Sequence, residues 1–398
     1  MKEVITVIGL GYVGLPLARA FTLKGFVVFG YDTSRKKVES FKNEGFIATK
    51  KPEECIPQSD YIIVCTPTPI DEKMKPDLSY VLDAVKVVSN YFKPGSTVVL
   101  ESTTYPGTTE EVIRPILEKT KKDFFLGYSP ERIDPGNTKY SIEKIPKIIS
   151  GINKESLEKI RWLYSHIIGD LVEVSDPKTA EATKLVENIF RAVNISLANE
   201  MALIFEQMGI DTYEVVDAAK TKPFGFMPFY PGPGIGGHCI PVDPFYLAWK
   251  ARQVGVESKF IELAGEISYK MTKHVAELIR DNSNDGMILI LGVAYKKNIS
   301  DTRNSPAKLI LEELNKNKRR IDFFDPYVKE YEGQKSIERG NIDLGKYECV
   351  VLLTDHSEFK ELVFEDYGGV LIDTRNFINT SNLNCRYIGI GKGGKSDE

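Results

Sequence analysis

A glycine-rich turn between two predicted elements constrains the fold of this chain more than any other feature. Residues Glu3–Ile8 form a short, mostly apolar run typical of a buried parallel strand, and Leu15–Lys24 is predicted to be a helix. Between them stands Gly9-Leu-Gly11-Tyr-Val-Gly14. Glycines at these positions let the backbone turn tightly and approach a pyrophosphate at the helix N-terminus. The motif therefore predicts a dinucleotide-binding βα unit, and a glycine-rich turn that binds no ligand is the alternative.

An acidic residue at the end of the next strand indicates which dinucleotide would bind. Phe26–Tyr31 is predicted to be a strand, and Asp32 follows it directly. A carboxylate at this point hydrogen-bonds a ribose diol and repels a 2′-phosphate. The sequence thus favours NAD over NADP.

Strands and helices keep alternating along the first part of the chain. Tyr61–Cys65, Thr97–Leu100 and Phe124–Gly127 are predicted strands, and Leu78–Tyr91 is a predicted helix. This alternation favours an α/β fold with a doubly wound sheet, whose ligands bind beyond the carboxyl ends of the strands. The residues at those ends include Thr66, Thr68, Thr103 and Glu131. Threonines at strand ends are also common turn formers, so each position alone is open to that interpretation.

A long central segment, Pro177–Met208, has the pattern of a single helix. Lys184 and Asn188 stand four residues apart and so share a face, although a solvated polar stripe is the ordinary interpretation of such a pair. A helix bundle or a subunit interface would cover its apolar side, which is marked by Phe190, Val193, Leu197 and Met201. With further helices predicted at Asp211–Ala219 and Ile261–Arg280, this part of the chain is predicted to be a helical domain.

The loop between these helices is rich in glycine and proline. It reads Tyr230-Pro-Gly-Pro-Gly-Ile-Gly-Gly-His-Cys239-Ile-Pro-Val-Asp243. Glycine allows close approach of the main chain and proline stiffens a loop, so the segment suits a backbone that lies against a ligand and presents one side chain. We expect that side chain to be Cys239, acting as a nucleophile with Asp243 nearby. A buried small cysteine in a tight turn is the alternative.

The α/β pattern restarts at Met287–Val293, a predicted strand, and a helix is predicted to start at Asp301-Thr-Arg303-Asn-Ser-Pro306. Further strands are predicted at Ile321–Phe324, Cys349–Leu353 and Val370–Ile372. This second unit is predicted to be Rossmann-like, without the glycine signature. We therefore expect three domains: residues 1–176 for NAD binding, 177–284 as the central helical domain with the cysteine loop, and 285–398 as the second Rossmann-like domain.

Composition excludes several function classes. The chain has 398 residues and a formal net charge of −4, whereas general nucleic-acid binding needs a basic surface. Its five cysteines and four histidines have no metal-ligand spacing, so no metal site is expected. No apolar run reaches membrane-spanning length and no secretory leader pattern is apparent, so we expect no membrane partner and a cytoplasmic location.

Together these residues resemble the UDP-glucose/GDP-mannose dehydrogenase family, the NAD-dependent nucleotide-sugar 6-dehydrogenases. The likeness covers essentially the whole chain, and its motifs occur in the family's order: the Gly9–Gly14 turn, Ser129-Pro-Glu131, Lys184-Leu-Val-Glu-Asn188, Gly236-Gly-His-Cys239 with Asp243, and Lys296-Lys-Asn-Ile-Ser-Asp-Thr-Arg303. The tract Pro223–Gly234 is most similar to the UDP-N-acetylglucosamine 6-dehydrogenases, with UDP-N-acetylmannosamine dehydrogenases as close relatives. The third domain would then bind the UDP-sugar.

The resemblance implies a four-electron oxidation of the sugar C6 alcohol to a carboxylate with two NAD⁺ per turnover. Cys239 would capture the aldehyde as a thiohemiacetal, which becomes a thioester and is then hydrolysed. Lys184 and Asn188 would stabilise the oxyanion at C6, while Asp243, with a water near Thr103, would move protons. Glu131 would act in thioester hydrolysis. Which carboxylate serves as the base in each step stays open.

The resemblance also implies two sets of binding residues. The NAD contacts would be Gly9, Gly11, Tyr12, Val13, Gly14, Asp32, Thr66, Thr68, Thr103 and Arg303. The UDP-sugar contacts would be Glu131, Arg132, Lys184, Asn188, Arg191, Tyr230, Gly232, Gly236, Tyr295, Lys296 and Arg375. The long helix would form the core of a homodimer, or of a dimer of dimers.

Several alternatives stay open. UDP-N-acetylglucosamine is the favoured substrate, whose uronic acid would serve surface polysaccharide synthesis, and UDP-N-acetylmannosamine or UDP-glucose are the alternatives. His238 before the cysteine and Arg191 both weaken the glucose assignment, although Arg191 is equally well explained as an exposed residue. A two-electron dehydrogenase of the hydroxyacid type is a further alternative, against which Cys239 argues. An inactive nucleotide-sugar-sensing protein is the alternative from another class.

Overall fold

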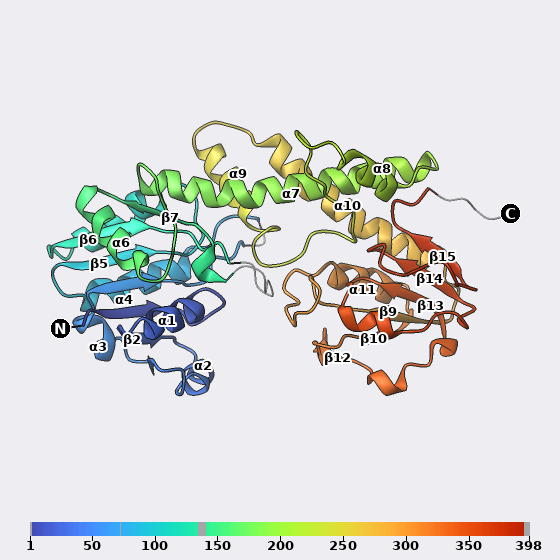
Figure 1. The fold of residues 1–398 in the computed structure, drawn as a ribbon, viewed down its shortest axis with the longest axis horizontal. Helices are drawn as coiled ribbons and strands as arrows, with labels where there is room; N and C mark the ends of the chain where they lie inside the picture. The colour runs from blue at the N-terminus through green and yellow to red at the C-terminus, as the bar shows by residue number, and fades with distance from the viewer. Residues whose placement is uncertain (1, 72, 134–140, 394–398) are drawn as a thin grey trace. The chain divides into compact units, whose positions relative to one another are not determined.

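The computed structural model of the protein describes residues 2–71, 73–133 and 141–393 (Figure 1). The chain divides into two compact units. The N-terminal unit comprises residues 1–187 and 245–257, and the C-terminal unit comprises residues 188–244 and 258–398. Two helices contribute residues to both units, namely α7 (Pro177–Gln207) and α9 (Asp243–Gln253).

The N-terminal unit is built on an eight-stranded sheet in the order β3-β2-β1-β4-β5-β6-β7-β8, in which only the β6–β7 pairing is antiparallel. The strands are β1 (Val4–Ile8), β2 (Val27–Tyr31), β3 (Ile47–Thr49), β4 (Tyr61–Val64), β5 (Ser96–Leu100), β6 (Phe124–Tyr128), β7 (Lys147–Gly151) and β8 (Leu171–Glu173). The helices are α1 (Gly14–Leu23), α2 (Arg35–Ser40), α3 (Pro52–Cys55), α4 (Ser79–Tyr91), α5 (Arg114–Glu118) and α6 (Lys154–Ser165). Two short 3₁₀ helices, η1 (Ile56–Gln58) and η3 (Ile142–Lys144), and a π-helix, η2 (Thr108–Ile113), accompany them.

Both faces of this sheet are covered, as expected for parallel strands that read as continuous apolar runs. Successive side chains point to opposite faces. On β4, Ile62 packs in one cluster with Val85 of α4, whereas Ile63 packs in another with Leu17 of α1 and Ile160 of α6. Because helices cover both faces, a ligand is expected to bind at the carboxyl ends of the strands, where the loops after β1, β4 and β5 begin.

The C-terminal unit contains a parallel five-stranded sheet in the order β10-β9-β13-β14-β15. The strands are β9 (Met287–Leu291), β10 (Arg320–Phe324), β13 (Tyr347–Leu352), β14 (Val370–Asp373) and β15 (Arg386–Gly389), and a separate antiparallel pair is formed by β11 (Glu330–Tyr331) and β12 (Gln334–Lys335). The helices are α8 (Thr212–Ala219), α10 (Lys259–Asp281) and α11 (Pro306–Lys316), with short turns η4 (Arg339–Asn341), η5 (Leu344–Lys346) and η6 (Ser357–Glu361).

The two faces of this second sheet are covered differently. Ile290 of β9 packs in a cluster with Val275 of α10 and Ile310 of α11. On the opposite face, Leu289 packs with Phe359 and other residues of the segments that follow β13 and β14. One layer is therefore helical and the other is formed by loops and short turns.

The predicted α/β fold, with two Rossmann-like sheets and a long central helix, is confirmed. The long helix ends at Gln207, one residue before the predicted end. Of the described helices and strands, eleven had no counterpart in the sequence analysis, namely α2, β3, α3, α5, β7, α6, β8, α9, β11, β12 and β15. Among the described residues, no helix is long and apolar enough to cross a membrane. No group of three or more potential metal ligands is found in the same residues.

Candidate active site

In the turn after β1, the three glycines are required for different structural reasons. Gly9 has a φ of +92°, and a Cβ at Gly14 would lie 2.0 Å from the carbonyl oxygen of Gly9. These two glycines are therefore required by the turn itself. At Gly11, by contrast, a Cβ would meet nothing within 4 Å. Open space beside this backbone is what close approach of a ligand requires.

Asp32, at the end of β2, is 7% exposed and held in a fixed orientation. Its Oδ2 accepts hydrogen bonds from the backbone N of Leu10 at 2.9 Å and from Nζ of Lys37 at 3.1 Å, and its Oδ1 accepts from the backbone N of Ser34 at 2.9 Å. The contact with Leu10 ties the carboxylate to the glycine turn. The acidic residue and the turn thus form one arrangement.

These residues fit a bound NAD. The first turn of α1 contains no acidic residue that would repel a pyrophosphate, and its N-cap residue is Val13. Tyr12 is 56% exposed beside the open space at Gly11. Asp32 stands where a ribose diol would be bound.

The loops after β4 and β5 are joined to each other. Ser102 Oγ donates a hydrogen bond to the carbonyl oxygen of Thr66 at 2.7 Å. Thr68 is buried, Thr103 is half-buried, and Thr66 Oγ1 is buried without a hydrogen-bond partner in the described residues. A buried hydroxyl without a partner costs free energy unless a ligand or water completes it.

Lys184 of α7 and Glu131 after β6 meet inside the N-terminal unit. Lys184 Nζ donates to the carbonyl oxygen of Glu131 at 2.6 Å. The Oε1 atom of Glu131 accepts hydrogen bonds from the backbone N–H groups of Arg132 and Ile133. Its Oε2 atom is buried and has no partner in the part of the chain that the structure describes. The carboxylate is thus held by one oxygen and leaves the other available to a water or a substrate.

A buried ion pair contacts the backbone immediately before Glu131. Lys147 Nζ donates to Glu101 Oε2 at 3.0 Å and to the carbonyl oxygen of Pro130 at 3.3 Å, and Tyr164 OH donates to the other oxygen of Glu101. Burial raises the pKa of Glu101 to about 7, although Lys147 lowers it. Through Pro130, this network fixes the backbone that carries Glu131.

Glu181 of α7 fixes the loop that follows Thr103. It is fully buried and accepts hydrogen bonds from the backbone N of Gly107 at 2.6 Å, the backbone N of Thr109 at 2.8 Å and Oγ1 of Thr109 at 2.7 Å. Sequence reasoning missed this residue. The signal was available, because Glu181 lies three residues before Lys184 and so shares its helix face.

In the C-terminal unit, Cys239 opens the turn that leads into α9. Its carbonyl oxygen accepts hydrogen bonds from the backbone N of Val242 at 3.0 Å and of Asp243 at 2.8 Å. The carboxylate of Asp243 in turn accepts from Nδ2 of Asn188 at 2.5 Å. Cys55, Cys65 and Cys349 are buried, and burial raises the pKa of each of these thiols. Cys239 and Cys385 are both half-buried. Of these two, Cys239 opens the turn that leads to a carboxylate bonded to Asn188, so it is the better candidate nucleophile.

The glycines of the cysteine loop let its backbone pack against other protein groups. A Cβ at Gly236 would lie 2.6 Å from Cβ of Tyr295, and one at Gly237 would lie 2.9 Å from the ring of the same tyrosine. A Cβ at Gly232 would lie 2.7 Å from Nη1 of Arg375. Hydrogen bonds also join the backbone of Gly237 to the carbonyl oxygen of Arg303 and to Nδ2 of Asn304, both at 3.0 Å.

The loop between β9 and α11 also holds charged residues beside the cysteine turn. Arg303 forms an ion pair with Asp301 at 2.7 Å.

His238 stands directly before Cys239. Burial and the charge of Arg303 lower the pKa of His238, which favours a neutral imidazole next to Cys239. The His238 Nδ1 atom lies 4.0 Å from the Cys239 sulfur.

A cavity of about 430 Å³ opens in the C-terminal unit. Tyr230, Arg375 and Asp355 are among its lining residues. Tyr230 stacks on Tyr213 with ring centroids 5.9 Å apart and donates its hydroxyl to Asp217 at 2.6 Å. Arg375 donates from Nε to the carbonyl oxygen of Leu353 at 3.0 Å. Aromatic rings beside a guanidinium suit a nucleotide.

The predicted site residues thus form groups within each unit. In the N-terminal unit lie the glycine turn, Asp32, the threonines, Glu131, Arg132 and Lys184. In the C-terminal unit lie Asn188, Arg191, Tyr230, Gly232, Gly236, Cys239, Asp243, Tyr295, Lys296, Arg303 and Arg375. Arg191 is exposed. Asn304, which holds Gly237, was not predicted, since nothing in its spacing distinguishes it from any loop asparagine.

Comparison with known proteins covers nearly the whole chain. Sequence profiles of the UDP-glucose/GDP-mannose dehydrogenase family match the NAD binding domain at residues 3–52 and 41–168, the central domain at 178–269 and the UDP binding domain at 289–380. The chain is 37% identical to UDP-N-acetyl-D-glucosamine 6-dehydrogenase of Pseudomonas aeruginosa, over 92% of this chain and 94% of that one. It is 34% identical to UDP-N-acetyl-D-mannosamine dehydrogenase of Methanococcus vannielii, over 94% and 93%.

Solved structures agree. The UDP-D-ManNAc dehydrogenase of Pyrococcus horikoshii superposes with a TM-score of 0.90 at 31% identity, covering 98% of this chain and 100% of that one. The UDP-N-acetyl-mannosamine dehydrogenase Cap5O of Staphylococcus aureus gives 0.86 at 28% identity, covering 98% of each chain. The chain therefore belongs to the UDP-glucose/GDP-mannose dehydrogenase family and is an NAD-dependent oxidoreductase of the nucleotide-sugar dehydrogenase class.

Proposed function

We propose that the protein oxidises the C6 alcohol of a UDP-N-acetylhexosamine to the uronic acid by a four-electron reaction. The favoured substrate is UDP-N-acetylglucosamine. The observation that carries the proposal is the arrangement around Cys239: a half-buried thiol at a turn whose next helix begins with Asp243, itself bonded to Asn188. Simple alcohol oxidation needs no nucleophile, whereas capture of an aldehyde does. The alternatives are the UDP-N-acetylmannosamine epimer and UDP-glucose.

In this reaction Cys239 adds to the C6 aldehyde, and the thiohemiacetal loses a hydride to become a thioester. Water then cleaves the thioester, which releases the acid and restores the thiol. Lys184 and Asn188 supply a cation and an amide dipole to the oxygen at C6. Asp243 moves the protons together with a water near Thr103, and the free oxygen of Glu131 orients the hydrolytic water.

The cofactor residues are assigned to the N-terminal unit, with Arg303 added from the C-terminal unit. Gly9, Gly11, Tyr12, Val13 and Gly14 would hold the pyrophosphate, and Asp32 would hold the ribose. Thr66, Thr68 and Thr103 would line the nicotinamide side. When bound, NAD⁺ accepts the two hydrides, one molecule for each oxidation.

The UDP-sugar is assigned to the remaining residues. Tyr230, Gly232 and Arg375 adjoin the cavity of the C-terminal unit, which suits a nucleoside, and Tyr295, Lys296 and Gly236 would follow towards the diphosphate. Arg132 and Arg191 would complete the sugar side. The domain limits 1–176, 177–284 and 285–398 and a dimer built on the long helix belong to the same proposal.

The decisive experiment measures NADH formed per mole of sugar, with UDP-N-acetylglucosamine and UDP-N-acetylmannosamine side by side. Two NADH from UDP-N-acetylglucosamine alone are expected. One NADH per sugar with an accumulating aldehyde would refute the role of Cys239 in capturing the aldehyde. Turnover of UDP-glucose alone would refute the N-acetylhexosamine assignment. Cys239→Ser should abolish acid formation while NAD binding and the melting temperature stay unchanged.

A further inference from the structure

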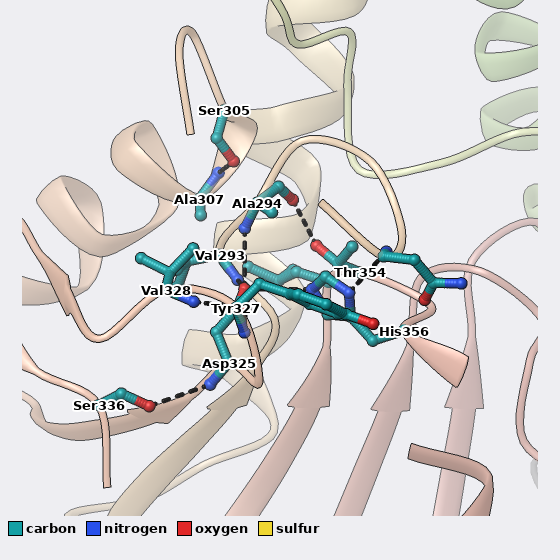
Figure 2. A network of polar contacts seen from close by, with 12 residues as sticks. Val293, Ala294, Ser305, Ala307, Asp325, Tyr327, Val328, Ser336, Thr354 and His356 are labelled. Atoms are coloured by element: carbon teal, nitrogen blue, oxygen red, sulfur yellow. Dashed lines mark hydrogen bonds and ion pairs between the residues drawn. The ribbon is translucent and has the colours of Figure 1, made fainter. Parts of the chain in front are cut away.

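A buried histidine that the proposed mechanism does not use lies just beyond β13 in the C-terminal unit. The side chain of His356 is 0% exposed and is bonded at both ring nitrogens (Figure 2). Its Nε2 lies 3.1 Å from Oδ2 of Asp325, and its Nδ1 lies 2.9 Å from the backbone N of Asn298. Because a backbone N–H can only donate, Nδ1 accepts, and the proton is on Nε2 and is donated to Asp325. The imidazole is therefore neutral and fixed in one tautomer.

Asp325 anchors this histidine. Its carboxylate also accepts hydrogen bonds from the backbone N–H groups of Val293, Ala294, Tyr327 and Val328 (Figure 2). Burial alone raises its pKa, but the bonds from His356 and the backbone hold the pKa of Asp325 below its ordinary value. Thr354 Oγ1 donates to the carbonyl oxygen of Ala294 at 2.5 Å. The start of the loop after β9 is thus held by residues from the ends of β10 and β13.

His356 and Ser357 hydrogen-bond to Asn298. That residue has a φ of +59°, a left-handed conformation in which asparagine is enriched among non-glycine residues. Its Oδ1 accepts from the backbone N of Ser357 at 2.9 Å, and its Nδ2 donates to Oγ of Ser357 at 2.8 Å. Lys297 Nζ lies 3.7 Å from Asp355. Three consecutive residues, 355 to 357, therefore contact the loop at residues 297 and 298.

The loop that they hold, residues 295–304, lies against the cysteine turn. The backbone N of Tyr295 donates to the carbonyl oxygen of Asp301 at 3.1 Å, which closes the loop on itself. The ring of Tyr295 packs on Gly237, and the backbone of Gly237 is bonded to Arg303 and Asn304. Tyr295 and Lys296 lie three and two residues before Asn298 in this loop, so a change in the position of Asn298 would shift them as well.

We propose that His356 is a positioning residue for the nucleotide-sugar diphosphate: by accepting the N–H of Asn298, it holds the 295–304 loop in the form in which Tyr295 and Lys296 meet that group. The inference rests on the proposed function for the identity of the ligand. The proposal assigns the effect on ligand binding to Nδ1 and not to Nε2.

Two variants separate the nitrogens. An asparagine side chain reaches about as far as Nδ1, so His356→Asn keeps an acceptor for Asn298 and loses the bond to Asp325. A glutamine side chain reaches about as far as Nε2, so His356→Gln keeps the donor to Asp325 and loses the acceptor. By calorimetry, His356→Gln should weaken binding of UDP about tenfold and His356→Asn less than about threefold. NAD⁺ affinity should change by less than about threefold in both, since Arg303 is the candidate NAD contact in this loop and the other candidate NAD contacts lie in the N-terminal unit.

Equal UDP affinity in His356→Gln and the wild type, or an equal loss in the two variants, would overturn the proposal. Hydrogen exchange of the peptide 295–304 provides a readout without ligand: faster exchange in His356→Gln than in His356→Asn is expected, and equal exchange would refute the proposal. Should either variant fail to fold, UDP is expected to slow exchange of this peptide in the wild type, and an unchanged rate would contradict the proposal. Wild-type protein that binds no UDP would instead refute the proposed function, and the exchange comparison of the variants would still decide whether His356 holds the 295–304 loop.

Discussion

Asn188 Nδ2 donates a hydrogen bond to Oδ2 of Asp243 over 2.5 Å, and both side chains are buried, at 5% and 3% exposed. Asp243 is also the first residue of α9, and its backbone N–H is bonded to the carbonyl oxygen of Cys239. One residue of the long helix thus orients a carboxylate whose own backbone closes the cysteine turn. This relationship gives Asn188 a second task beside the expected contact with the C6 oxygen.

Replacing Asn188 by alanine is expected to lower kcat for NADH formation about 100-fold, because the site loses both an amide donor and the orientation of Asp243. KM for NAD⁺ should stay within about threefold of the wild type. Asn194→Ala is the matched control, since Asn194 lies on the same helix and donates to the carbonyl oxygen of Phe190. Steady-state kinetics decide, and a kcat for Asn188→Ala close to that of the control would contradict the assignment.

The sequence predicted the dinucleotide turn well because its signal is local. Strand, glycines, helix and acidic residue follow one another within about thirty residues, and the order of these elements is itself the fold. The structure bears out the strands and helix on either side of Gly9 and adds the bond from Leu10 to Asp32. Periodicity also sufficed for α7, since a long run without glycine or internal proline leaves few other conformations.

The cysteine loop was harder to interpret, because its glycines respond to contacts that are distant in sequence. Glycine is compatible with approach to a ligand or to protein, and Tyr295 and Arg375 occupy the space beside Gly236, Gly237 and Gly232. Helix α9 was missed for a related reason: its first turn follows a proline-rich stretch that reads as loop. The tautomer of His356 was equally inaccessible, since it depends on a backbone N–H 58 residues away in the sequence.

The substitution Gly237→Ala should destabilise the protein in two ways, through backbone strain and through a steric clash. Gly237 has a φ of +99° and a Cβ there would lie 2.9 Å from the Tyr295 ring, so Gly237→Ala should combine backbone strain with a steric clash. We expect a loss of on the order of 2–4 kcal/mol in the free energy of unfolding of the C-terminal unit. Denaturant titration followed by fluorescence measures this loss.

Gly225→Ala is the matched control for this substitution. Gly225 has a φ of +70°, but a Cβ there would meet nothing within 4 Å, so a loss of about 1 kcal/mol from strain alone is expected. If the two variants lost the same free energy, the packing of Tyr295 on Gly237 would not be the reason for the glycine. A double variant with Tyr295→Ala should restore part of the stability lost in Gly237→Ala.

Glu181 should make the stability of the protein depend on pH. Burial raises its pKa to about 7, against the hydrogen bonds from Thr109 and Gly107, whereas in the unfolded chain the pKa is about 4.3. Between these two values the folded state binds more protons than the unfolded state. The stability that Glu181 contributes is therefore full below about pH 4.3 and is lost as the pH rises to about 7.

Glu181→Gln removes this titration. From pH 5 to pH 8, the free energy of unfolding should fall less in the variant than in the wild type, by on the order of 1–3 kcal/mol. Glu155→Gln, at an exposed position of α6 in the same unit, should retain the wild-type slope. Parallel slopes for wild type and Glu181→Gln across this range would show that Glu181 stays ionised when the protein folds.

Asp32 should decide between NAD and NADP. Its carboxylate would bind the ribose diol, and Lys37, whose Nζ lies 3.1 Å from Oδ2, would lose its partner if the carboxylate were removed. Asp32→Ser is expected to raise KM for NAD⁺ about tenfold, because a charge-assisted hydrogen bond to the diol is lost. The freed Lys37 ammonium should at the same time improve the use of NADP⁺, since it can meet a 2′-phosphate.

The added substitution Lys37→Met in the Asp32→Ser variant is the control. It should cancel the gain with NADP⁺ but not the loss with NAD⁺. The ratio of kcat/KM for the two cofactors measures both effects, and a ratio unchanged from the wild type in Asp32→Ser would exclude Asp32 as the residue that selects the cofactor.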